Sequence, residues 1–319
     1  MHEQQPATDT DTNTDTFAPA IPTTHPPLVI LNPAGASGRA ARLRPLIERG
    51  LLGGRGELVL TAAPRDGERL AREAALAGRD VVAVGGDGTV AEVGNGILAS
   101  GRRVRLGIVP CGTGNDYAFE TLRLPKDPAR ALDIALAGTP ATLDAGQVNG
   151  RYFLNSLGVG IDANIAHAAE RLKRYPLMRG QTLYWTASLT ELLFHYDRCP
   201  LLTVQADDTP PENRLYALAA VSLGPTYGGG FRINPGADPS DGYFDLCTVR
   251  KPSQRRALQL LPMIEKGKHL DQPEVQHSRV RRVSMRAAQP IHAHLDGEVI
   301  SAQEFEARIL PGALLVRRG

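Results

Sequence analysis

Short apolar runs alternate with amphipathic stretches between residues 28 and 137. Runs such as LVIL and VVAV carry no polar residue, which is typical of strands that are covered on both faces. In the stretches between them, apolar residues recur at helical spacing. The alternation predicts strands at 28–33, 57–63, 80–86 and 105–110, and helices at 38–49, 66–77, 89–99, 115–120 and 128–137. Such a series predicts an α/β domain with a parallel sheet and helices on both of its faces.

The pattern changes after about Asp144. Short β-type runs, among them LLTVQA and LYALAAVSLG, follow one another between Gly, Pro, Asn and Asp turns. Two helical stretches, at 177–196 and 253–266, interrupt them. This pattern predicts a second, largely antiparallel β domain. The first 27 residues are rich in Thr, Asp and Pro and hold little that could be buried, so a disordered tail is expected there.

Composition narrows the class of protein. A chain of 319 residues suggests about two domains, and a net charge of +2 gives no bulk attraction to nucleic acid. The three cysteines form no CxxC pattern, which favours a reducing, cytoplasmic setting. The longest apolar run, near 215–223, is too short to span a bilayer, and the N-terminus lacks the features of a signal peptide.

Three glycine-rich turns follow strands whose carboxyl ends share one sheet edge, where ligands of open α/β sheets bind. The first, NPAGASGRA, lets backbone amides face an anion, although taken alone it is better explained as a plain strand-to-helix loop. The third, VPCGTGNDYA, ends in Asn115 and Asp116, which could also serve as helix N-caps. Three such turns at neighbouring strand ends predict one anion-binding site.

The second turn, GGDGT at 85–89, places a carboxylate where phosphate would be repelled. A magnesium ion between Asp87 and phosphate would reverse the local charge. Glu92 lies one helical turn further on, and Thr89 is a candidate N-cap of the helix. The chain has no GxxxxGK[ST] motif and is therefore not a P-loop ATPase.

Three further patterns have a structural explanation as well as a functional one. The segment HLDGEVI, at 294–300, carries Asp296 and Glu298 on either side of a glycine, which is either a simple turn or a source of a general base. His292 and His294 share a strand face but lack a third ligand, so surface or packing roles are favoured over metal binding. Two GxGxxA matches lack the βαβ context of a dinucleotide site.

Taken together, these motifs resemble the diacylglycerol kinase catalytic family, and most nearly its soluble bacterial members of the diacylglycerol kinase B and YegS types. The motifs that carry the resemblance are NPxGxxG, GGDGTxxE, PxGTGNDxA, FLNSLGVGIDA, GGGFRINPGADPSDGYFDL and the late DGE. The resemblance covers about residues 28–319. It implies a nucleotide domain at 28–143 completed by about 304–319, a β-sandwich lipid domain at 144–303, and transfer of phosphate from MgATP to a lipid hydroxyl in the cleft between them.

The resemblance also implies residue roles. It assigns the nucleotide to Asn32, Pro33, Ala34, Gly35, Ala36, Ser37, Thr61, Gly86, Asp87, Gly88, Thr89, Val90, Ala91, Glu92 and Thr113. It assigns a catalytic magnesium network to Asp87, Asp116 and Asp144, and a structural magnesium to Asp241 with the carbonyls of Phe244 and Leu246. Asp296 and Glu298 match the pair that contains the base, with the choice between them open. Ala91 departs from the usual family Asn.

Alternatives remain at this point. An NAD kinase shares GGDGT but fits the GTGNDYA turn poorly, and a non-catalytic lipid-binding module could share the fold. The sequence identifies neither the lipid, with diacylglycerol as the default, nor the oligomeric state, a homodimer included. Ten Lys or Arg against three Asp or Glu at 250–286, together with Arg171, Lys173, Arg174 and Arg179, suggest peripheral contact with an anionic inner membrane face, although a solvated basic face explains them nearly as well.

Overall fold

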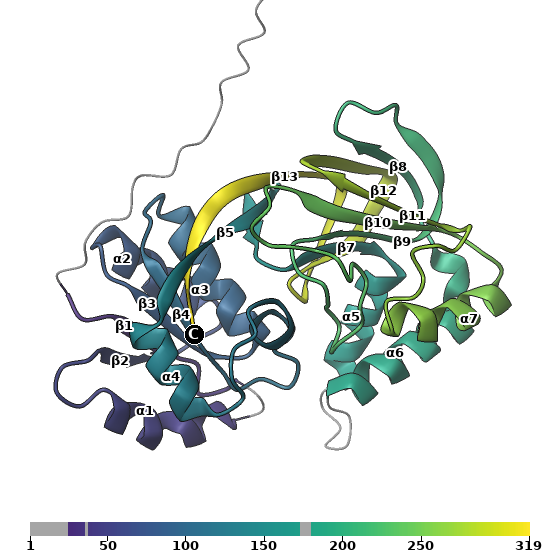
Figure 1. Cartoon of the computed structure of the whole chain (residues 1–319). Helices are drawn as coiled ribbons and strands as arrows, with labels where there is room; N and C mark the ends of the chain where they lie inside the picture. Colours follow the sequence, from purple (N-terminus) through teal and green to yellow (C-terminus); the bar gives the residue numbers. More distant parts are fainter. Residues whose placement is uncertain (1–24, 36–37, 173–179) are drawn as a thin grey trace, which may run out of the picture.

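The computed structural model describes residues 25–35, 38–172 and 180–319, and Figure 1 shows them as two lobes joined by long strands. The expected tail at 1–27 therefore lies almost wholly outside the described residues. A mixed α/β N-terminal lobe and a β-rich C-terminal lobe confirm the predicted two-part architecture.

Four strands of the N-terminal lobe pair in parallel, in the order β2-β1-β3-β4. They are β1 (Leu28–Leu31), β2 (Glu57–Leu60), β3 (Val81–Gly85) and β4 (Arg105–Pro110). All residues of β1 and β3 are buried, because helices cover both faces of the sheet. The carboxyl ends of β1, β3 and β4 therefore open onto one edge, and the three glycine-rich turns follow there.

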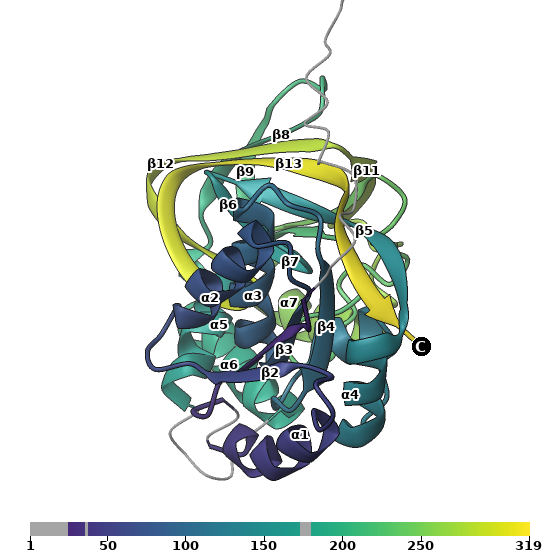
Figure 2. The same cartoon turned by 90° about the vertical axis from the view of Figure 1, so that its left-hand side faces the viewer.

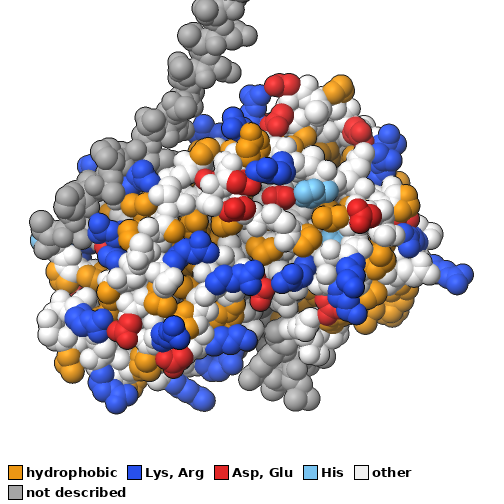
Figure 3. All heavy atoms as spheres, in the orientation of Figure 1, with side chains coloured by type: hydrophobic (Ala, Val, Ile, Leu, Met, Phe, Trp, Pro, Cys, Tyr) orange, Lys and Arg blue, Asp and Glu red, His pale blue; other side chains and the backbone are white. Residues whose placement is uncertain are grey.

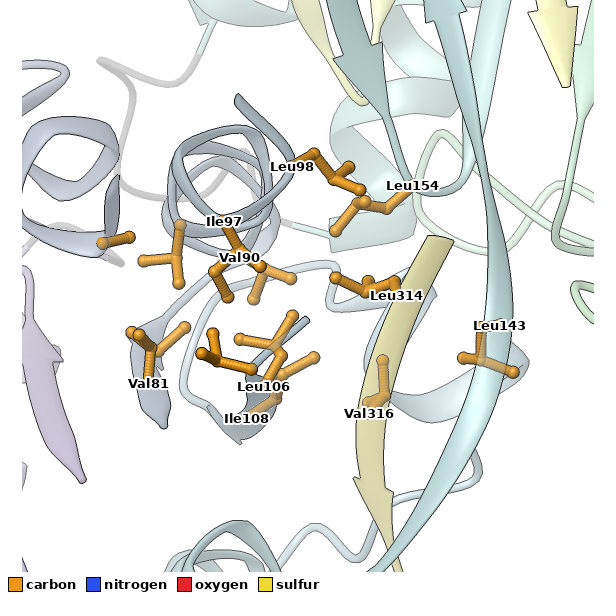
Figure 4. Close-up of a cluster of buried hydrophobic side chains, with 14 of the residues drawn as sticks. Val81, Val90, Ile97, Leu98, Leu106, Ile108, Leu143, Leu154, Leu314 and Val316 are labelled. Carbon is orange, nitrogen blue, oxygen red and sulfur yellow. The ribbon is translucent and has the colours of Figure 1, made fainter. Parts of the chain in front are cut away.

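Alternate residues of each strand pack against different helices. Ile30, Ala83 and Ile108 face α2 (Asp66–Leu76) and α3 (Asp87–Ala99), whereas Leu31 and Val84 face the opposite pair of helices. That opposite pair is α1 (Arg44–Gly50), which a short 3-10 turn η1 (Ala40–Leu43) precedes, and α4 (Pro128–Ala137). In Figure 4, Val81, Leu106 and Ile108 of the sheet cluster with Val90 and Ile97 of α3.

The C-terminal lobe is built from antiparallel pairs. Its strands are β6 (Arg151–Phe153), β7 (Ser156–Gly160), β8 (Leu201–Ala206), β9 (Glu212–Ser222), β10 (Phe244–Arg250), β11 (Val275–Val280) and β12 (Arg282–Leu295). Because β7 and β8 each pair with both β9 and β12, these four strands close on themselves. They enclose a core that includes Phe153, Phe244 and Phe305.

Three helices cover the other side of the β9–β10 region: α5 (Ile161–Leu172), α6 (Gly180–Phe194) and α7 (Gln254–Glu265). The last two correspond to the helical stretches predicted at 177–196 and 253–266. Helix α5 was not predicted, since only the stretches at 177–196 and 253–266 were expected to be helical after residue 144. A helix expected at 115–120 is instead a single π-helical turn, η2 (Tyr117–Thr121), preceded by Asn115 at φ +58°.

Two strands belong to both lobes, β5 (Thr139–Val148) and β13 (Glu298–Arg318), and Figure 2 shows β13 arching from one lobe into the other. The N-terminal half of β13 pairs with β12, and its last residues pair in parallel with β4 through Leu315 and Val316. The thirteen strands of the described chain thus form one continuous sheet. The boundary expected at 143/144 falls inside β5.

Candidate active site

The turns after β1 and β3 meet through side chains. Asn32 Nδ2 donates a hydrogen bond to Thr89 Oγ1 at 3.2 Å, and Asn32 Oδ1 accepts one from the Ala34 amide at 3.1 Å. Thr89 therefore does not cap α3, whose N-cap is Gly86 and has no side-chain cap bond. The hydroxyl of Thr89 instead fastens the first turn to the second. Ala36 and Ser37 lie outside the described residues.

The turns after β3 and β4 touch through their glycines. A Cβ on Gly112 would stand 2.6 Å from the Gly86 Cα, and one on Gly85 would stand 2.3 Å from Thr89 Oγ1. A side chain on Gly112 would push the two turns apart, and one on Gly85 would displace Thr89 within its own turn. The glycines therefore allow the backbone of both turns to line one small polar region. Asn115 closes the second of these turns, because its Oδ1 accepts from the Gly112 amide at 2.8 Å.

Asp87 and Asp116 lie next to each other at this edge. Asp87 Oδ2 accepts the Asn115 amide at 2.7 Å, and Asp116 Oδ2 accepts the Gly229 amide at 2.8 Å. Burial raises the pKa of Asp116 to about 7, and the neighbouring charge of Asp87 adds to the increase. Two carboxylates that oppose each other's ionisation form a donor set suited to a hard divalent cation, which would relieve the repulsion.

This donor set fits magnesium. Within the described residues, no cluster of three or more His, Cys, Asp and Glu side chains is positioned to hold a metal ion. Magnesium typically takes one or two protein carboxylates, and water and substrate phosphate complete its octahedron. Asp87 and Asp116 supply that number.

A polar cleft joins these turns to the C-terminal lobe. It is lined on one side by Asn32, Ala34, Gly35, Gly86, Asp87, Gly88, Thr89, Ala91, Glu92 and Thr113, and on the other by Arg151, Asp296 and Glu298. Three residues predicted for the nucleotide do not line it. Thr61 is buried with its amide bonded to Leu31, Pro33 lies outside the lining, and Val90 faces a second cavity.

Glu92 has a structural task in this cleft that sequence reasoning missed. Its carboxylate accepts hydrogen bonds from the amides of Arg65 and Gly67, both at 3.2 Å, at the start of α2.

Asn95, one turn further along α3, is bonded through its side chain to both backbone groups of Tyr152 in β6. Helix α3 therefore fixes the spacing between the two lobes as well as carrying Asp87.

The turn between β12 and β13 presents Asp296 and Glu298 to the cleft, with Asp296 at φ +48° and Gly297 at φ +90°. The Asp296 carboxylate accepts three amides, from Leu154 at 2.7 Å and from Asn155 and Ser156 at 2.9 Å each. Burial raises its pKa, although these three amides act in the opposite direction.

Glu298 is held differently. Its carboxylate forms a two-pronged ion pair with Arg151, at 3.0 and 2.6 Å, and its side chain remains about half exposed in the cleft. The two acids of the DGE motif thus line one cleft but are held by different groups. Main-chain amides hold the Asp296 carboxylate, and the guanidinium of Arg151 holds that of Glu298.

A second, apolar cavity opens from the same place and runs into the C-terminal lobe between the sheet and helices α5, α6 and α7. The two cavities share Asp87, Ala91, Asp116, Tyr184, Asp296 and Gly297. The carboxylates therefore stand where a polar ligand in the cleft would meet an apolar ligand in the cavity.

A polar cluster that sequence reasoning missed lies in the wall of the apolar cavity. Tyr227 donates to Asp162 at 3.0 Å, and His294 Nε2 lies 3.3 Å from the same carboxylate oxygen without hydrogen-bond alignment. His294 is buried, in keeping with the packing role expected for it. Asp162 falls inside the GVGIDA stretch, which contributed to the family resemblance and to a rejected dinucleotide pattern but was assigned no residue role.

Two of the expected metal positions do not fit. Asp144 lines neither cavity, and its carboxylate accepts the amides of Gly242 and Gly312 at 2.7 Å each, so the structure does not join it to Asp87 and Asp116. Asp241 is ion-paired with Arg279, which also stacks on Tyr243. A guanidinium thus holds the carboxylate that the second magnesium would need.

The strand carbonyls expected for that second ion belong to the sheet. Phe244 and Leu246 lie in β10, in register with Val280 and Ser278 of β11. The second magnesium was expected only from the family resemblance. The sequence gave no indication that Arg279 would lie opposite Asp241. No step is therefore assigned to a second magnesium.

Comparison with known proteins gives matches over almost the whole described chain. Residues 26–148 match the diacylglycerol kinase catalytic domain, and residues 155–318 match the YegS C-terminal NAD kinase beta sandwich-like domain. A diacylglycerol kinase from Bacillus subtilis (strain 168) is 31% identical, over 75% of this chain and 77% of its own length. A protein from Chromohalobacter salexigens named "Probable lipid kinase YegS-like" is 36% identical, over 78% and 79%.

A solved structure from Bacillus anthracis strain Sterne, described as a diacylglycerol kinase, superimposes with a TM-score of 0.69 at 19% identity, covering 93% of this chain and 98% of its own. This likeness supports the fold. In the described residues, no helix is both long and apolar enough to cross a membrane.

Proposed function

The chain belongs to the diacylglycerol kinase catalytic family, and on that basis we propose that it transfers the γ-phosphoryl group of MgATP to the free hydroxyl of diacylglycerol, forming phosphatidic acid. Family membership makes the protein an ATP-dependent lipid kinase. The observation that carries the proposal is that Asp87, Asp116 and Asp296 stand where the polar cleft meets the apolar cavity.

In this proposal each lobe binds one of the two substrates. Residues 28–143 with about 304–319 bind ATP, and residues 144–303 bind the lipid. The backbone of the three glycine-rich turns binds the phosphates, since amides at a helix N-terminus favour anions. The acyl chains occupy the apolar cavity, whose lining includes Ile161, Leu218 and Leu261.

Asp87 and Asp116 would hold the magnesium ion that accompanies ATP. That ion supplies charge neutralisation on the β- and γ-phosphates, which is most of what phosphoryl transfer requires besides positioning. The amides of Asn115 and Gly229 fix the direction of the two carboxylates before substrate arrives.

Glu298 is the residue that we assign to accept the hydroxyl proton. Asp296 already accepts three main-chain amides, out of about four lone-pair sites on a carboxylate, whereas Glu298 is held only by Arg151. As the lipid oxygen attacks the γ-phosphorus, its proton passes to Glu298, the bond to the β-phosphate oxygen breaks, and ADP leaves. Asp296 orients the turn that carries Glu298.

Two other functions are less well supported. The relatives named above are lipid kinases, which does not favour an NAD kinase. A non-catalytic lipid-binding module would not require Asp87 and Asp116 to lie so close together that the pKa of Asp116 is raised. It would not require a polar cleft beside them either.

The test is phosphate transfer from radiolabelled ATP to a panel of lipid alcohols and to NAD, with the product identified by mass. The proposal expects labelled phosphatidic acid that forms only with magnesium. Labelling of NAD, or of another lipid in preference to diacylglycerol, would overturn the substrate assignment.

A further inference from the structure

Large apolar side chains are exposed at one end of the C-terminal lobe. Phe194 is 75% exposed at the last residue of α6, with Leu193 at 48% beside it. Leu201, the first residue of β8, and Leu215 of β9 are also about half exposed. Scattered exposed leucines are ordinary, but a group of them at one place marks an interaction site.

Main-chain contacts bring these side chains together. Leu201 and Leu215 are paired in the β8–β9 ladder, and the Lys251 amide donates to the Leu215 carbonyl. Gln254 Nε2, at the start of α7, donates to the carbonyls of Leu192 and Leu193. We call Leu193, Phe194, Leu201 and Leu215 the apolar rim.

Basic residues surround the apolar rim. Arg198 and Arg214 lie close to it in the chain, and so do the acids Asp197 and Glu212. Lys251, whose amide bonds to Leu215, and Arg255, which follows Gln254, add two more basic residues. Among the described residues, Arg198 and Arg255 have no acidic partner. The rim therefore combines exposed apolar groups with an excess of positive charge.

The basic residues of 250–286 do not form a single face. Arg256 is paired with Glu274 and Arg279 with Asp241, and on the face in Figure 3 Lys and Arg are spread over both lobes among Asp and Glu. Lys173, Arg174 and Arg179 lie outside the described residues. The charge pattern of the sequence alone thus does not define a membrane surface.

The apolar cavity extends beneath the apolar rim. Its lining includes Leu192, which precedes Leu193 of the rim, and Pro252, which follows Lys251. It also includes Ala257 and Leu261, which lie one turn apart on α7. Its other end is formed by Asp87, Asp116 and Asp296. The cavity lining thus extends from Leu192, the residue before the rim, to the carboxylates.

We infer that the apolar rim docks on an anionic bilayer surface and that the lipid enters the apolar cavity from there. The inference rests on the proposed function for its substrate. Each buried CH₂ is worth about 0.8 kcal/mol, so a lipid with two long chains cannot pass through water at a useful rate and must be drawn from the bilayer. Exposed Phe and Leu enter the headgroup boundary, while Lys and Arg are attracted to anionic lipid.

The test uses the full chain and vesicles of phosphatidylcholine with and without phosphatidylglycerol. The double variant Phe194→Glu/Leu201→Glu should bind anionic vesicles at least about tenfold more weakly than wild type, because it removes apolar contacts and adds negative charge. The matched control is Leu52→Glu, because Leu52 is 71% exposed on the N-terminal lobe, and it should bind like wild type. Wild-type binding should weaken in high salt.

A soluble short-chain diacylglycerol separates this inference from the proposed function. The double variant should phosphorylate the soluble lipid at the wild-type rate and lose rate only on vesicles. Wild-type vesicle binding by the double variant would overturn the docking surface, as would equal loss in Leu52→Glu. Failure of the wild type itself on the soluble lipid would overturn the proposed function, and the vesicle-binding comparison would still decide the docking surface.

Discussion

Each acid of the site is oriented by the main chain or by one arginine, and this determines what each can do. Asp87 accepts the amide of Asn115 and Asp116 accepts that of Gly229, so the main chain of two opposing turns orients both carboxylates towards one place. Asp296 accepts three amides and stabilises the turn, and Glu298 faces the cleft beside Arg151. The carboxylates are therefore divided among metal binding, support of the turn and proton transfer.

Replacing Asp87 by Asn should remove most activity and preserve the fold. The amide is nearly isosteric but lacks the charge that holds magnesium, and loss of such a contact costs about two to three orders of magnitude in turnover. Steady-state kinetics across a magnesium titration measures the effect, with exposed Asp133→Asn as the control. Near-wild-type turnover in Asp87→Asn would refute the metal assignment.

The two acids of the DGE motif should respond differently to neutral substitution. Glu298→Gln should lower kcat strongly while ATP affinity and melting temperature stay close to wild type, because only the proton acceptor is lost. Asp296→Asn should lower the melting temperature as well, since its NH₂ group cannot accept the three amides. If Glu298→Gln kept full kcat while Asp296→Asn folded normally but lost kcat, the proton acceptor would be Asp296.

Burial of His269 makes stability depend on pH. Burial lowers the pKa of this histidine from 6.5 to about 4, so the folded protein keeps it neutral while the unfolded chain takes up a proton. Its contribution to stability is therefore present above about pH 6.5 and is lost as the pH falls towards about 4. In urea unfolding, His269→Asn should lose less stability over this range than wild type, and exposed His292→Asn should match wild type. Parallel pH profiles for all three proteins would contradict the claim.

Among the elements, α3 connects sheet, site and second lobe. Its N-terminus carries Asp87, its middle approaches α2 at Gly96, and Asn95 bonds to β6. The sequence predicted this helix and the turn before it because local periodicity and glycine spacing encode both. It did not predict α5, although that helix is amphipathic. Nor did it predict the bond from Asn95 to β6, which depends on contacts between distant segments.

Gly96 should tolerate no side chain. A Cβ there would stand 2.2 Å from the Glu68 carbonyl oxygen of α2, so Gly96→Ala must separate the two helices. We expect a loss of about 1–3 kcal/mol in the free energy of unfolding, measured by denaturant titration. Gly236→Ala, where a Cβ meets open space, is the control and should leave stability nearly unchanged. Equal stability of the two variants would show that α2 and α3 adapt freely.

At the scale of the whole molecule, a continuous sheet fixes the two lobes relative to each other. Strand β13 runs from the DGE turn to β4, and Arg317 near its end pairs with the buried Asp80 at 3.0 Å. The fold classes of both lobes could be read from periodicity, and the position of Asp87, Asp116, Asp296 and Glu298 around one cleft agrees with what the motifs suggested. The sequence could not predict the placement of Asp144 or the pairing of Asp241 with Arg279. Both depend on which distant segments of the chain pack beside these two aspartates.

The central claim is that this chain phosphorylates diacylglycerol with Asp87 and Asp116 holding the metal. The most direct measurement is transfer of label from γ-labelled ATP to diacylglycerol in anionic vesicles, by wild type and by Asp87→Asn, with and without magnesium. Wild type with magnesium should give labelled phosphatidic acid, and the variant, or either protein without the ion, should give almost none. Equal labelling by wild type and Asp87→Asn, or labelling of NAD instead of lipid, would contradict it.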